Sequence, residues 1–532
     1  MGGQVADAVV IGSGPNGLVA ANALADAGWD VIVLEAADDP GGAVSSAEVT
    51  APGFVTDLFS AFYPLAAASP IIRDLDLGAH GLEWCRSPDV LAHALDDGRA
   101  AVLHSSVHDT AAGLDEFSPG DGPAWTAMFE QWQRIRDPLL DALFTPFPPV
   151  TSMLAMLRKL GSSGVVDFAR LGLTPVRRLA QERFKGDGAA LLLTGNAMHS
   201  DLPPDAAGSG MFGWLLAMLG QDVGFPVPRH GAGRLADALV QRARSRGAEV
   251  RTGAEVVSVH VRNSRAVGVL LRDGSAVRAR RAVLADVSAP ALYQHLLAPG
   301  DVPPRMLRDL DQFQWDNSTI KVNWALSQPI PWTAPGARQA GTVHLGVDVD
   351  GFVDFAADLS TRRRPRAPFI LLGQMTTADP TRSPAGTESA WAYTHVPRDL
   401  DWSPERVAGH VRRVEEAVER VAPGFTASQV ARFVQSPTDL EHVDANLNGG
   451  AINGGTSGLH QQLFMRPTPG LGRPETPISA LFLASASAHP GGGVHGACGW
   501  NAARAALGAN GPRGLAQRAL VRTAWARLLK DR

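Results

Sequence analysis

The stretch VADAVVIGSGPNGLVAANALADAGWDVIVLE, residues 5–35, limits what this chain can fold into more than any other. Its apolar run at 5–11 predicts a buried parallel strand. Glycines then follow with the spacing G-x-G-x-x-G, and we expect a helix over about 15–27 and a second strand over 31–34. A strand, a glycine turn, a helix, a second strand and an acid in this order predict a dinucleotide site.

Each residue type in this stretch has a physical role. Gly12 makes the tight turn, Gly14 lets the backbone meet a pyrophosphate, and Gly17 allows the helix to pack closely on the strand. The helix N-terminus presents the positive end of its dipole to the phosphates. Glu35 is placed to accept hydrogen bonds from a ribose hydroxyl.

A second glycine pair helps to separate NAD from FAD. Gly41 and Gly42 stand in DDPGGAVSS, shortly after the acid that ends the second strand. A pair at this distance fits many flavoproteins, in which the chain turns back beneath the diphosphate of the cofactor. The pair therefore favours FAD.

The stretch HPGGGVHGACGW near the C-terminus permits two interpretations. His489, His495 and Cys498 have the ligand chemistry of a zinc site. Gly491–Gly493 instead remove side chains, so that backbone N–H groups can approach a bulky, polar ligand. The three glycines favour the second interpretation, and we expect no metal.

Composition excludes several classes of protein. The chain of 532 residues has a formal charge of −5 and a pI near 6.3, which gives no electrostatic reason to bind nucleic acid. Its only cysteines, Cys85 and Cys498, exclude a disulfide framework, and the first strand begins too early for a signal peptide. The apolar, uncharged stretch 206–220 is shorter than the ~20 residues that cross a bilayer. We expect a cytoplasmic protein.

Methionines gather in two apolar stretches, 151–161 and 206–220. Met153, Met156 and Met218 are among them. The plainer interpretation is helix core, because methionine fills irregular gaps. The alternative is a flexible lining for an elongated apolar substrate.

The motifs GSGPNGLVAAN, LEAADDPGG, PRHGAGRLADAL, RAVLADVS and LFLASASAHPGGGVHGACGWNAA resemble, in this order, the FAD-dependent phytoene desaturase superfamily. The likeness covers nearly the whole chain and is greatest for its phytoene dehydrogenase-related branch. Ala43 departs from the arginine that many desaturases and amine oxidases carry after the glycine pair. We therefore do not assign phytoene itself as the substrate.

The resemblance implies an α/β fold with a Rossmann-type FAD-binding domain assembled from discontinuous segments, 1–75, 225–300 and 430–510. A mixed α+β substrate domain would comprise 76–224 and 301–429. Within the first domain we expect a helix over 233–245 and strands over 249–251, 255–262, 265–271 and 276–284. We also expect a strand over 481–484 and a final helix over 497–507, whose N-terminus points at the flavin.

We predict FAD contacts from four parts of the chain: the first turn, the second strand with its glycine pair, the later strands of the sheet, and the C-terminal turn. These residues are Gly12, Ser13, Gly14, Asn16, Gly17, Glu35, Ala36, Gly41, Gly42, Val256, Ala285, His489, Pro490, Gly491, Gly492, Gly493 and Val494.

Four residues are candidates for proton handling. Lys321 alternates with Ile320, Val322 and Trp324 and resembles, by segment, the strand lysine that holds a water near the flavin in amine oxidases; a solvated surface lysine is the alternative. His199 and Asp201 form an imidazole and carboxylate pair, although Asp201 could instead begin a turn or helix. His489 adjoins the glycines and is expected to touch the cofactor.

The resemblance implies an FAD-dependent oxidoreductase that moves hydride from an apolar, isoprenoid-like or lipid-like CH–CH unit to flavin N5, with a quinone or oxygen as electron acceptor. An amine or alcohol oxidase, a saturase and a non-catalytic flavoprotein scaffold are the alternatives. The sequence is also compatible with a homo-oligomer. The basic, amphipathic tail at 511–532 offers peripheral contact with the inner face of a membrane or, alternatively, packs on its own domain or on a second subunit.

Overall fold

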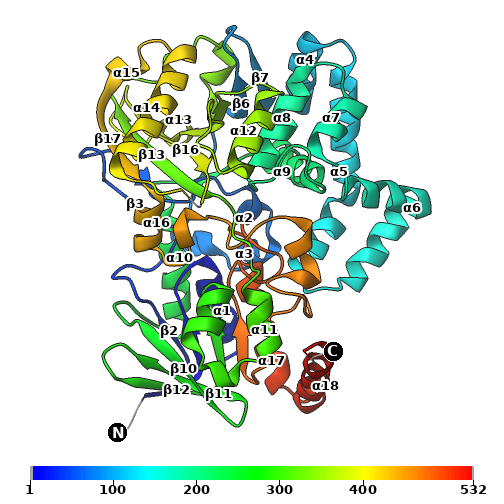
Figure 1. The fold of residues 1–532 in the computed structure, drawn as a ribbon, viewed down its shortest axis with the longest axis vertical. Helices are drawn as coiled ribbons and strands as arrows, with labels where there is room; N and C mark the ends of the chain where they lie inside the picture. The colour runs from blue at the N-terminus through cyan, green and yellow to red at the C-terminus, as the bar shows by residue number, and fades with distance from the viewer. Residues whose placement is uncertain (1–3, 399, 530–532) are drawn as a thin grey trace.

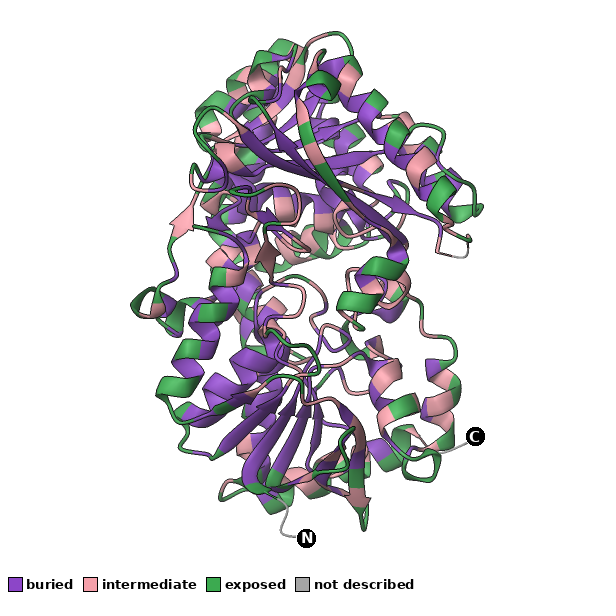
Figure 2. Cartoon of the chain, turned by 90° about the vertical axis from the view of Figure 1, so that its left-hand side faces the viewer, coloured by how far each residue is buried: buried purple, intermediate pink, exposed green. Residues whose placement is uncertain are grey.

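The chain is built around two seven-stranded sheets, one in each half of the molecule (Figure 1). The structure, a computed structural model, describes residues 4–398 and 400–529. Strands of both sheets are largely buried (Figure 2). The first sheet lies in the lower half in Figure 1, close to the N-terminus, and the second lies in the upper half.

The first sheet has the order β10-β11-β12-β1-β2-β9, and β18 pairs with β12 off this path. The strand β1 is parallel to both of its neighbours, as the dinucleotide motif predicts. The strands β10, β11 and β12 form an antiparallel meander. The strands of this sheet are β1 (Gln4–Ile11), β2 (Val31–Leu34), β9 (Glu249–Arg251), β10 (Val256–Arg262), β11 (Arg265–Leu271), β12 (Ala276–Ala285) and β18 (Leu481–Leu483). The predicted strands are confirmed to within one residue.

Successive residues of β1 face opposite sides of this sheet, because side chains alternate along a strand. Ala8 and Val10 pack with helices α1 (Pro15–Asp26), α10 (Gly233–Ser245) and α17 (Ala497–Asn510). Val9 and Ile11 pack into a second core with β18 and α11 (Pro304–Leu310). Both faces are thus covered, as a Rossmann-type α/β sheet requires.

The second sheet has the order β17-β13-β16-β15-β14-β6-β7 and is antiparallel except where β14 meets β6. Ile320, Val322 and Trp324 of β13 lie on one face and pack beneath α14 (Pro404–Val421). This confirms the predicted alternation. The strands are β6 (Asp89–Ala94), β7 (Ala100–His104), β13 (Ser318–Leu326), β14 (Ala340–Leu345), β15 (Ile370–Gln374), β16 (Glu388–Val396) and β17 (Gln429–Gln435). The strand β17 crosses the predicted domain boundary at 430, because it pairs with β13.

Helices cover the side of the second sheet that carries β6 and β7 (Figure 1). They are α4 (Val107–Phe117), α5 (Asp121–Phe144), α7 (Val176–Arg183), α8 (Asp187–Met198), α9 (Ser209–Val223) and α12 (Gly351–Ser360). The helix α6 (Val150–Leu171) packs on α5 and projects beyond these helices (Figure 1). Short elements lie between the two halves or beside the second sheet: α2 (Pro64–Ala68), α3 (Pro70–Asp74), α13 (Met375–Ala378), α15 (Phe425–Ser428), α16 (Pro437–Val443) and the strands β3 (Ser46–Ala47), β4 (Thr56–Asp57), β5 (Trp84–Cys85) and β8 (Val227–Pro228).

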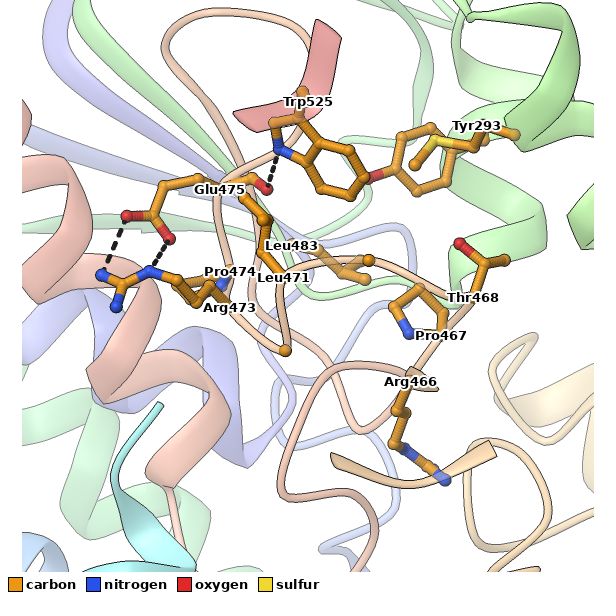
Figure 3. Close-up of a pocket in the computed structure, with 13 residues that line it drawn as sticks. Tyr293, Arg466, Pro467, Thr468, Leu471, Arg473, Pro474, Glu475, Leu483 and Trp525 are labelled. Carbon is orange, nitrogen blue, oxygen red and sulfur yellow. Dashed lines mark hydrogen bonds and ion pairs between the residues drawn. The ribbon is translucent and has the colours of Figure 1, made fainter. Parts of the chain in front are cut away.

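The C-terminal helix α18 (Gly514–Leu528) packs on the first half of the molecule through Trp525. The Trp525 indole donates a 3.1 Å hydrogen bond to the Glu475 carbonyl, and Figure 3 shows it beside Tyr293. Leu515 and Leu520 are exposed instead. The tail thus uses its tryptophan to pack on its own domain, which is one of the two alternatives for this segment, and contact with a membrane stays a prediction. Residues 530–532 lie outside the described residues.

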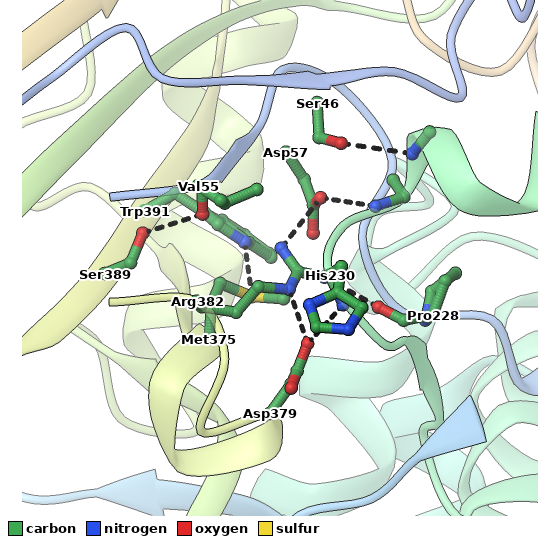
Figure 4. A network of polar contacts seen from close by, with 12 residues as sticks. Ser46, Val55, Asp57, Pro228, His230, Met375, Asp379, Arg382, Ser389 and Trp391 are labelled. Carbon is green, nitrogen blue, oxygen red and sulfur yellow. Dashed lines mark hydrogen bonds and ion pairs between the residues drawn. The ribbon is translucent and has the colours of Figure 1, made fainter. Parts of the chain in front are cut away.

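A buried arginine ties the two halves together. The Arg382 guanidinium donates hydrogen bonds to the Asp57 and Asp379 carboxylates at 2.9 and 3.0 Å, and all three side chains are fully buried (Figure 4). It also donates to the Pro228 carbonyl. Three distant segments of the chain thus share one charge cluster.

We expect Arg382→Leu to lower the free energy of unfolding by about 3–5 kcal/mol, because it leaves two buried carboxylates without their cation. Denaturant titration of FAD-saturated protein measures this change. As a control, Arg73→Leu removes an exposed arginine and should change the value by no more than about 0.5 kcal/mol. Equal denaturation midpoints for Arg382→Leu and the wild type would show that the cluster is dispensable.

Candidate FAD-binding and catalytic site

The two glycine-rich turns, which lie at opposite ends of the chain, meet at the carboxyl edge of the first sheet. A Cβ atom added to Gly499, in the first turn of α17, would lie 1.8 Å from the Asn16 carbonyl oxygen in the first turn of α1. In the first turn of α1, a Cβ on Gly17 would lie 2.3 Å from the Gly12 carbonyl oxygen. No side chain fits at either place, so the N-termini of α1 and α17 lie against each other.

The predicted contacts of the dinucleotide turn lie close together. The Ser13 backbone N–H and hydroxyl both donate to the Glu35 carboxylate at 2.7 Å. The Gly41 N–H donates to the Ser13 carbonyl at 3.0 Å, and a Cβ on Gly42 would lie 3.3 Å from Gly14 Cα. The glycine pair thus lies beside the turn.

The remaining predicted contacts of the first sheet border the same edge. Ala285 ends β12 opposite Ile11, and Val256 begins β10. The chain just before β10 passes Glu35, because the Ala254 N–H donates to the Glu35 carbonyl at 2.7 Å. Ala36 follows Glu35 directly.

These residues fit an FAD molecule. The turn leaves no room for side chains, so that backbone N–H groups of a helix N-terminus are available to a diphosphate. The Asn16 side-chain oxygen is buried there and accepts no hydrogen bond from the part of the chain that the structure describes. Bound FAD would supply a hydride acceptor at this edge of the sheet.

The C-terminal turn is held by its own side chains. His489 Nε2 lies 3.2 Å from the Thr145 carbonyl, and His495 Nδ1 accepts from the Ala497 N–H at 3.0 Å at the start of α17. The Cys498 thiol lies 3.6 Å from the carbonyls of Ala488 and Gly491, and burial raises its pKa to about 12. Each candidate zinc ligand thus has a separate role. In the described parts of the chain, no three His, Cys, Asp or Glu side chains are arranged to hold a metal ion.

The glycines of this turn make a close contact with the loop after α16. A Cβ on Gly492 would lie 2.8 Å from the Asn453 carbonyl oxygen, and one on Gly493 would lie 2.7 Å from the Leu65 side chain. Pro490 and Val494 flank the glycines. The loop at 444–456 therefore belongs to the site, although the glycine pattern alone did not indicate it.

Two further carboxyl groups lie at the dinucleotide turn. The Gly17 N–H donates to Asp286 Oδ2 at 2.7 Å, and burial raises the pKa of Asp286 to about 8. Burial, together with the nearby Glu35 charge, raises the pKa of Asp444 to about 6. Asp286 directly follows the strand that ends in RAVLA, a position from which a side chain at the carboxyl edge could have been expected.

Lys321 lies on the face of the second sheet that is turned toward the first half. Its ammonium group donates to the Asp57 carbonyl and lies 5.2 Å from the centre of the Trp391 ring. The side chain is buried, and burial lowers its pKa to about 7. The alternative of a solvated surface lysine is wrong, since β4 covers this position.

The same face carries an aromatic wall. Lys321 pairs with Tyr393 across β13 and β16, and Tyr393 stacks on Trp391 with ring centres 6.0 Å apart. The Phe62 ring lies 6.0 Å from the Trp391 ring and is tilted by 55° to it. These rings form an apolar cluster with the buried residues Ala61, Val227, Met375 and Ala378.

Next on this face comes a buried group of acids and an imidazole. His395 pairs with Thr319, and its Nδ1 atom lies 3.9 Å from Asp201 Oδ1. His395 is fully buried, and among the described residues neither of its ring nitrogens has a hydrogen-bond partner. Asp201 accepts from the backbone and side chain of Asn317. It lies in the turn that follows α8, as one alternative expected, and begins no helix.

Asp316 connects this group to the C-terminal glycine turn, residues 491–493. The Asp316 carboxylate accepts from the N–H groups of Ile452 and Asn453 at 2.8 and 3.0 Å, and the Asn453 carbonyl packs against Gly492. Burial and the Asp201 charge raise the pKa of Asp316. His395 was not predicted because nothing near it in the sequence marks it; only the pairing of β16 with β13 brings it to Asp201.

His199 lies farther along the same face. Its Nε2 atom lies 2.9 Å from His344 Nε2, and burial lowers the pKa of His199 to about 3. The structure therefore places His199 and Asp201 with different histidine partners. A neutral imidazole of so low a pKa takes up a proton poorly at neutral pH.

Comparison with known proteins places the chain among flavoproteins. Residues 16–507 match the family model described as flavin containing amine oxidoreductase. The chain is 30% identical to pyridine nucleotide-disulfide oxidoreductase domain-containing protein 2 of Mus musculus, over 93% of this chain and 92% of the relative. It is 26% identical to the zeta-carotene-forming phytoene desaturase of Myxococcus xanthus, over 91% and 90%. A solved putrescine oxidase variant shares the fold, with a TM-score of 0.60 and 17% identity over 95% of this chain and 99% of the oxidase.

We expect Gly14→Val to give colourless protein, because its side chain would occupy the space where the backbone meets the pyrophosphate and would lie 2.9 Å from Asp286 Oδ2. The ratio of flavin to protein absorbance measures bound FAD. Gly78→Ala is the control, since nothing lies within 4 Å of its added Cβ. A folded Gly14→Val variant with one FAD per chain would refute the assignment of this turn.

The raised pKa of Asp286 leads us to expect that FAD affinity depends on pH. Its pKa of about 8 keeps the side chain neutral at pH 7, whereas the ionised form above pH 8 opposes the diphosphate and holds the Gly17 N–H. We expect FAD affinity to fall by roughly tenfold for each pH unit above 8. Asp286→Asn should abolish that fall in a fluorescence titration, and an identical fall in the variant would assign it to another group.

Proposed function

We propose that this chain, which belongs to the family of flavin containing amine oxidoreductases, desaturates an apolar substrate of isoprenoid or lipid-like character. As a member of this family it is an FAD-dependent oxidoreductase. The substrate class rests on the proposed surface for it, which is the face of the second sheet that carries Trp391, Tyr393 and His395. The phytoene desaturase among its relatives acts, by its name, on a hydrocarbon, which supports the same class.

The observation that carries this proposal is the stacked pair of aromatic rings beside an unpartnered, buried imidazole. The Trp391 and Tyr393 rings offer dispersion contacts to a hydrocarbon. His395 offers a base whose ring nitrogens have no other partner. An apolar C–H donor needs no more than these two features and the flavin.

The cation–π position at the aromatic wall is already occupied. The Lys321 amine lies 5.2 Å from the centre of the Trp391 ring and donates to the Asp57 carbonyl. The Arg382 guanidinium is neutralised by Asp57 and Asp379 (Figure 4). Amine oxidation is the weaker alternative, because a substrate ammonium would have to displace Lys321 from the ring.

In the proposed reaction one C–H bond of the substrate gives up a hydride, for which bound FAD would be the acceptor, and the neighbouring C–H bond gives up a proton, so that a C=C bond forms. His395 accepts the proton, and the Asp201 carboxylate at 3.9 Å stabilises the resulting imidazolium. The aromatic wall excludes water and orients the chain of the substrate. The electrons pass onward to a quinone or to oxygen, and the reaction takes place in the cytoplasm or at the inner face of its membrane.

Anaerobic flavin reduction across a panel of isoprenoids, lipids, amines and alcohols tests the substrate class. Loss of flavin absorbance with an apolar polyene, and none with amines or alcohols, is the expected outcome. Reduction by amines or alcohols alone would replace desaturation with an oxidase activity. If a reduced nicotinamide cofactor reduces the flavin and the product is saturated, the enzyme works in the opposite direction, and a flavin that no compound reduces would favour a non-catalytic scaffold.

We expect His395→Gln to slow substrate-dependent flavin reduction by about 10²-fold or more while FAD stays bound, because the variant cannot accept the proton. Stopped-flow absorbance measures the rate. His410→Gln is the matched control: His410 is equally buried with unpartnered nitrogens, but it lies on α14 behind the sheet. Equal rates in the wild type and in His395→Gln would remove His395 as the base.

A further inference from the structure

The helix α6 projects from the side of the molecule, away from both sheets (Figure 1). Gly161, with φ 69° and ψ 178°, interrupts it, so that residues 150–160 form a separate first half. Within this half, Ser152 and Met156 are buried and attach the helix to the protein. The opposite side of the same half is free in the structure.

That free side is apolar. Val150, Met153, Leu154 and Leu157 are 57, 56, 48 and 44% exposed. They have the spacing i, i+3, i+4 and i+7, which places them on one face of a helix. Single exposed leucines are ordinary, whereas a continuous apolar stripe that faces solvent marks an interaction surface. The methionine-rich stretch is thus neither wholly core nor a substrate lining, because Met153 faces outward.

The stripe continues onto a neighbouring loop. Phe147, just before α6, packs on Phe464 with ring centres 5.4 Å apart, and its N–H donates to the Gly472 carbonyl at 3.1 Å. Phe464 and Leu463 are 44 and 45% exposed. We call this combined surface the α6 patch, and it consists of Val150, Met153, Leu154, Leu157, Leu463 and Phe464.

The charge around the α6 patch indicates its partner. Residues 150–166 contain no aspartate or glutamate but carry Arg158 and Lys159, both exposed, in a chain whose net charge is −5. A locally basic, amphipathic half-helix on an acidic protein fits an anionic lipid surface, which attracts cations and receives apolar side chains. We propose that the α6 patch docks the protein on the surface of an anionic bilayer.

This docking would place the lipid surface close to the active site. The segment before α6, residues 144–145, contacts the C-terminal glycine turn. His489 contacts the Thr145 carbonyl, and His495 packs on Phe144 with ring centres 5.3 Å apart. A lipid-soluble substrate would thus reach the site without crossing water. The docking proposal itself rests on the α6 patch alone and does not require the proposed substrate class. In the described part of the chain no helix has the length and hydropathy to span a bilayer.

Co-sedimentation of the full-length, FAD-loaded protein with vesicles tests the proposal. The vesicles contain either phosphatidylcholine alone or equal parts of phosphatidylcholine and phosphatidylglycerol. We expect binding to the anionic vesicles and a partition coefficient at least tenfold lower for the double variant Leu154→Gln and Leu157→Gln. The variant Arg158→Gln and Lys159→Gln should lose about fivefold for each charge on anionic vesicles and nothing on neutral ones.

The matched control replaces two equally exposed leucines on the C-terminal helix, Leu515→Gln with Leu520→Gln, which are 79 and 72% exposed. This control should bind as the wild type does. If the control loses binding and the α6 variant keeps it, or if the wild type does not bind at low salt, the proposal is overturned. A wild type that is a dimer in light scattering, and that the α6 variant converts to a monomer without any change in vesicle binding, would also overturn it. Flavin content reports whether each variant is folded, and flavin reduction by detergent-solubilised substrate separates this result from the proposed function.

Discussion

The close approach of two helix N-termini is the constraint on which the rest of the structure depends. Helices α1 and α17 come from opposite ends of the chain and meet where Gly499 packs on the Asn16 carbonyl. Because backbone lies against backbone, both turns must be free of side chains, and the two helix dipoles point into one space. The strands β12 and β18 are parallel neighbours in the sheet, and this pairing brings the C-terminal turn to the first one.

The two faces of the second sheet differ in polarity: one packs as an apolar core, and the other carries buried polar groups. Beneath α14 the side chains are apolar. On the other face, imidazoles, carboxyl groups and Lys321 are taken out of water, which favours their neutral forms and shifts their pKa values accordingly. Such a face costs stability, and polar groups that are kept buried in this way are characteristic of functional sites.

Paired charges limit this cost where neutralisation is impossible. An arginine keeps its proton in proteins, so Arg382 is buried together with Asp57 and Asp379. Asp57 lies in β4, on the segment that follows the glycine pair, and its carbonyl also accepts a hydrogen bond from the Lys321 ammonium group. The same residue therefore relates the cofactor half of the molecule to the aromatic wall.

The sequence by itself determined the dinucleotide half of this protein. Spacing and local chemistry were enough for Gly12, Gly14, Gly17, the strands of the first sheet and the helix after the C-terminal glycines, since these signals lie within short stretches. The tertiary structure decided the rest. His395, Asp316 and Asp286 lie next to their partners only because strands and loops distant in sequence pair or pack together. Periodicity likewise shows that a helix has an apolar stripe, but not whether that stripe faces the core, as Trp525 does, or solvent, as Leu154 does.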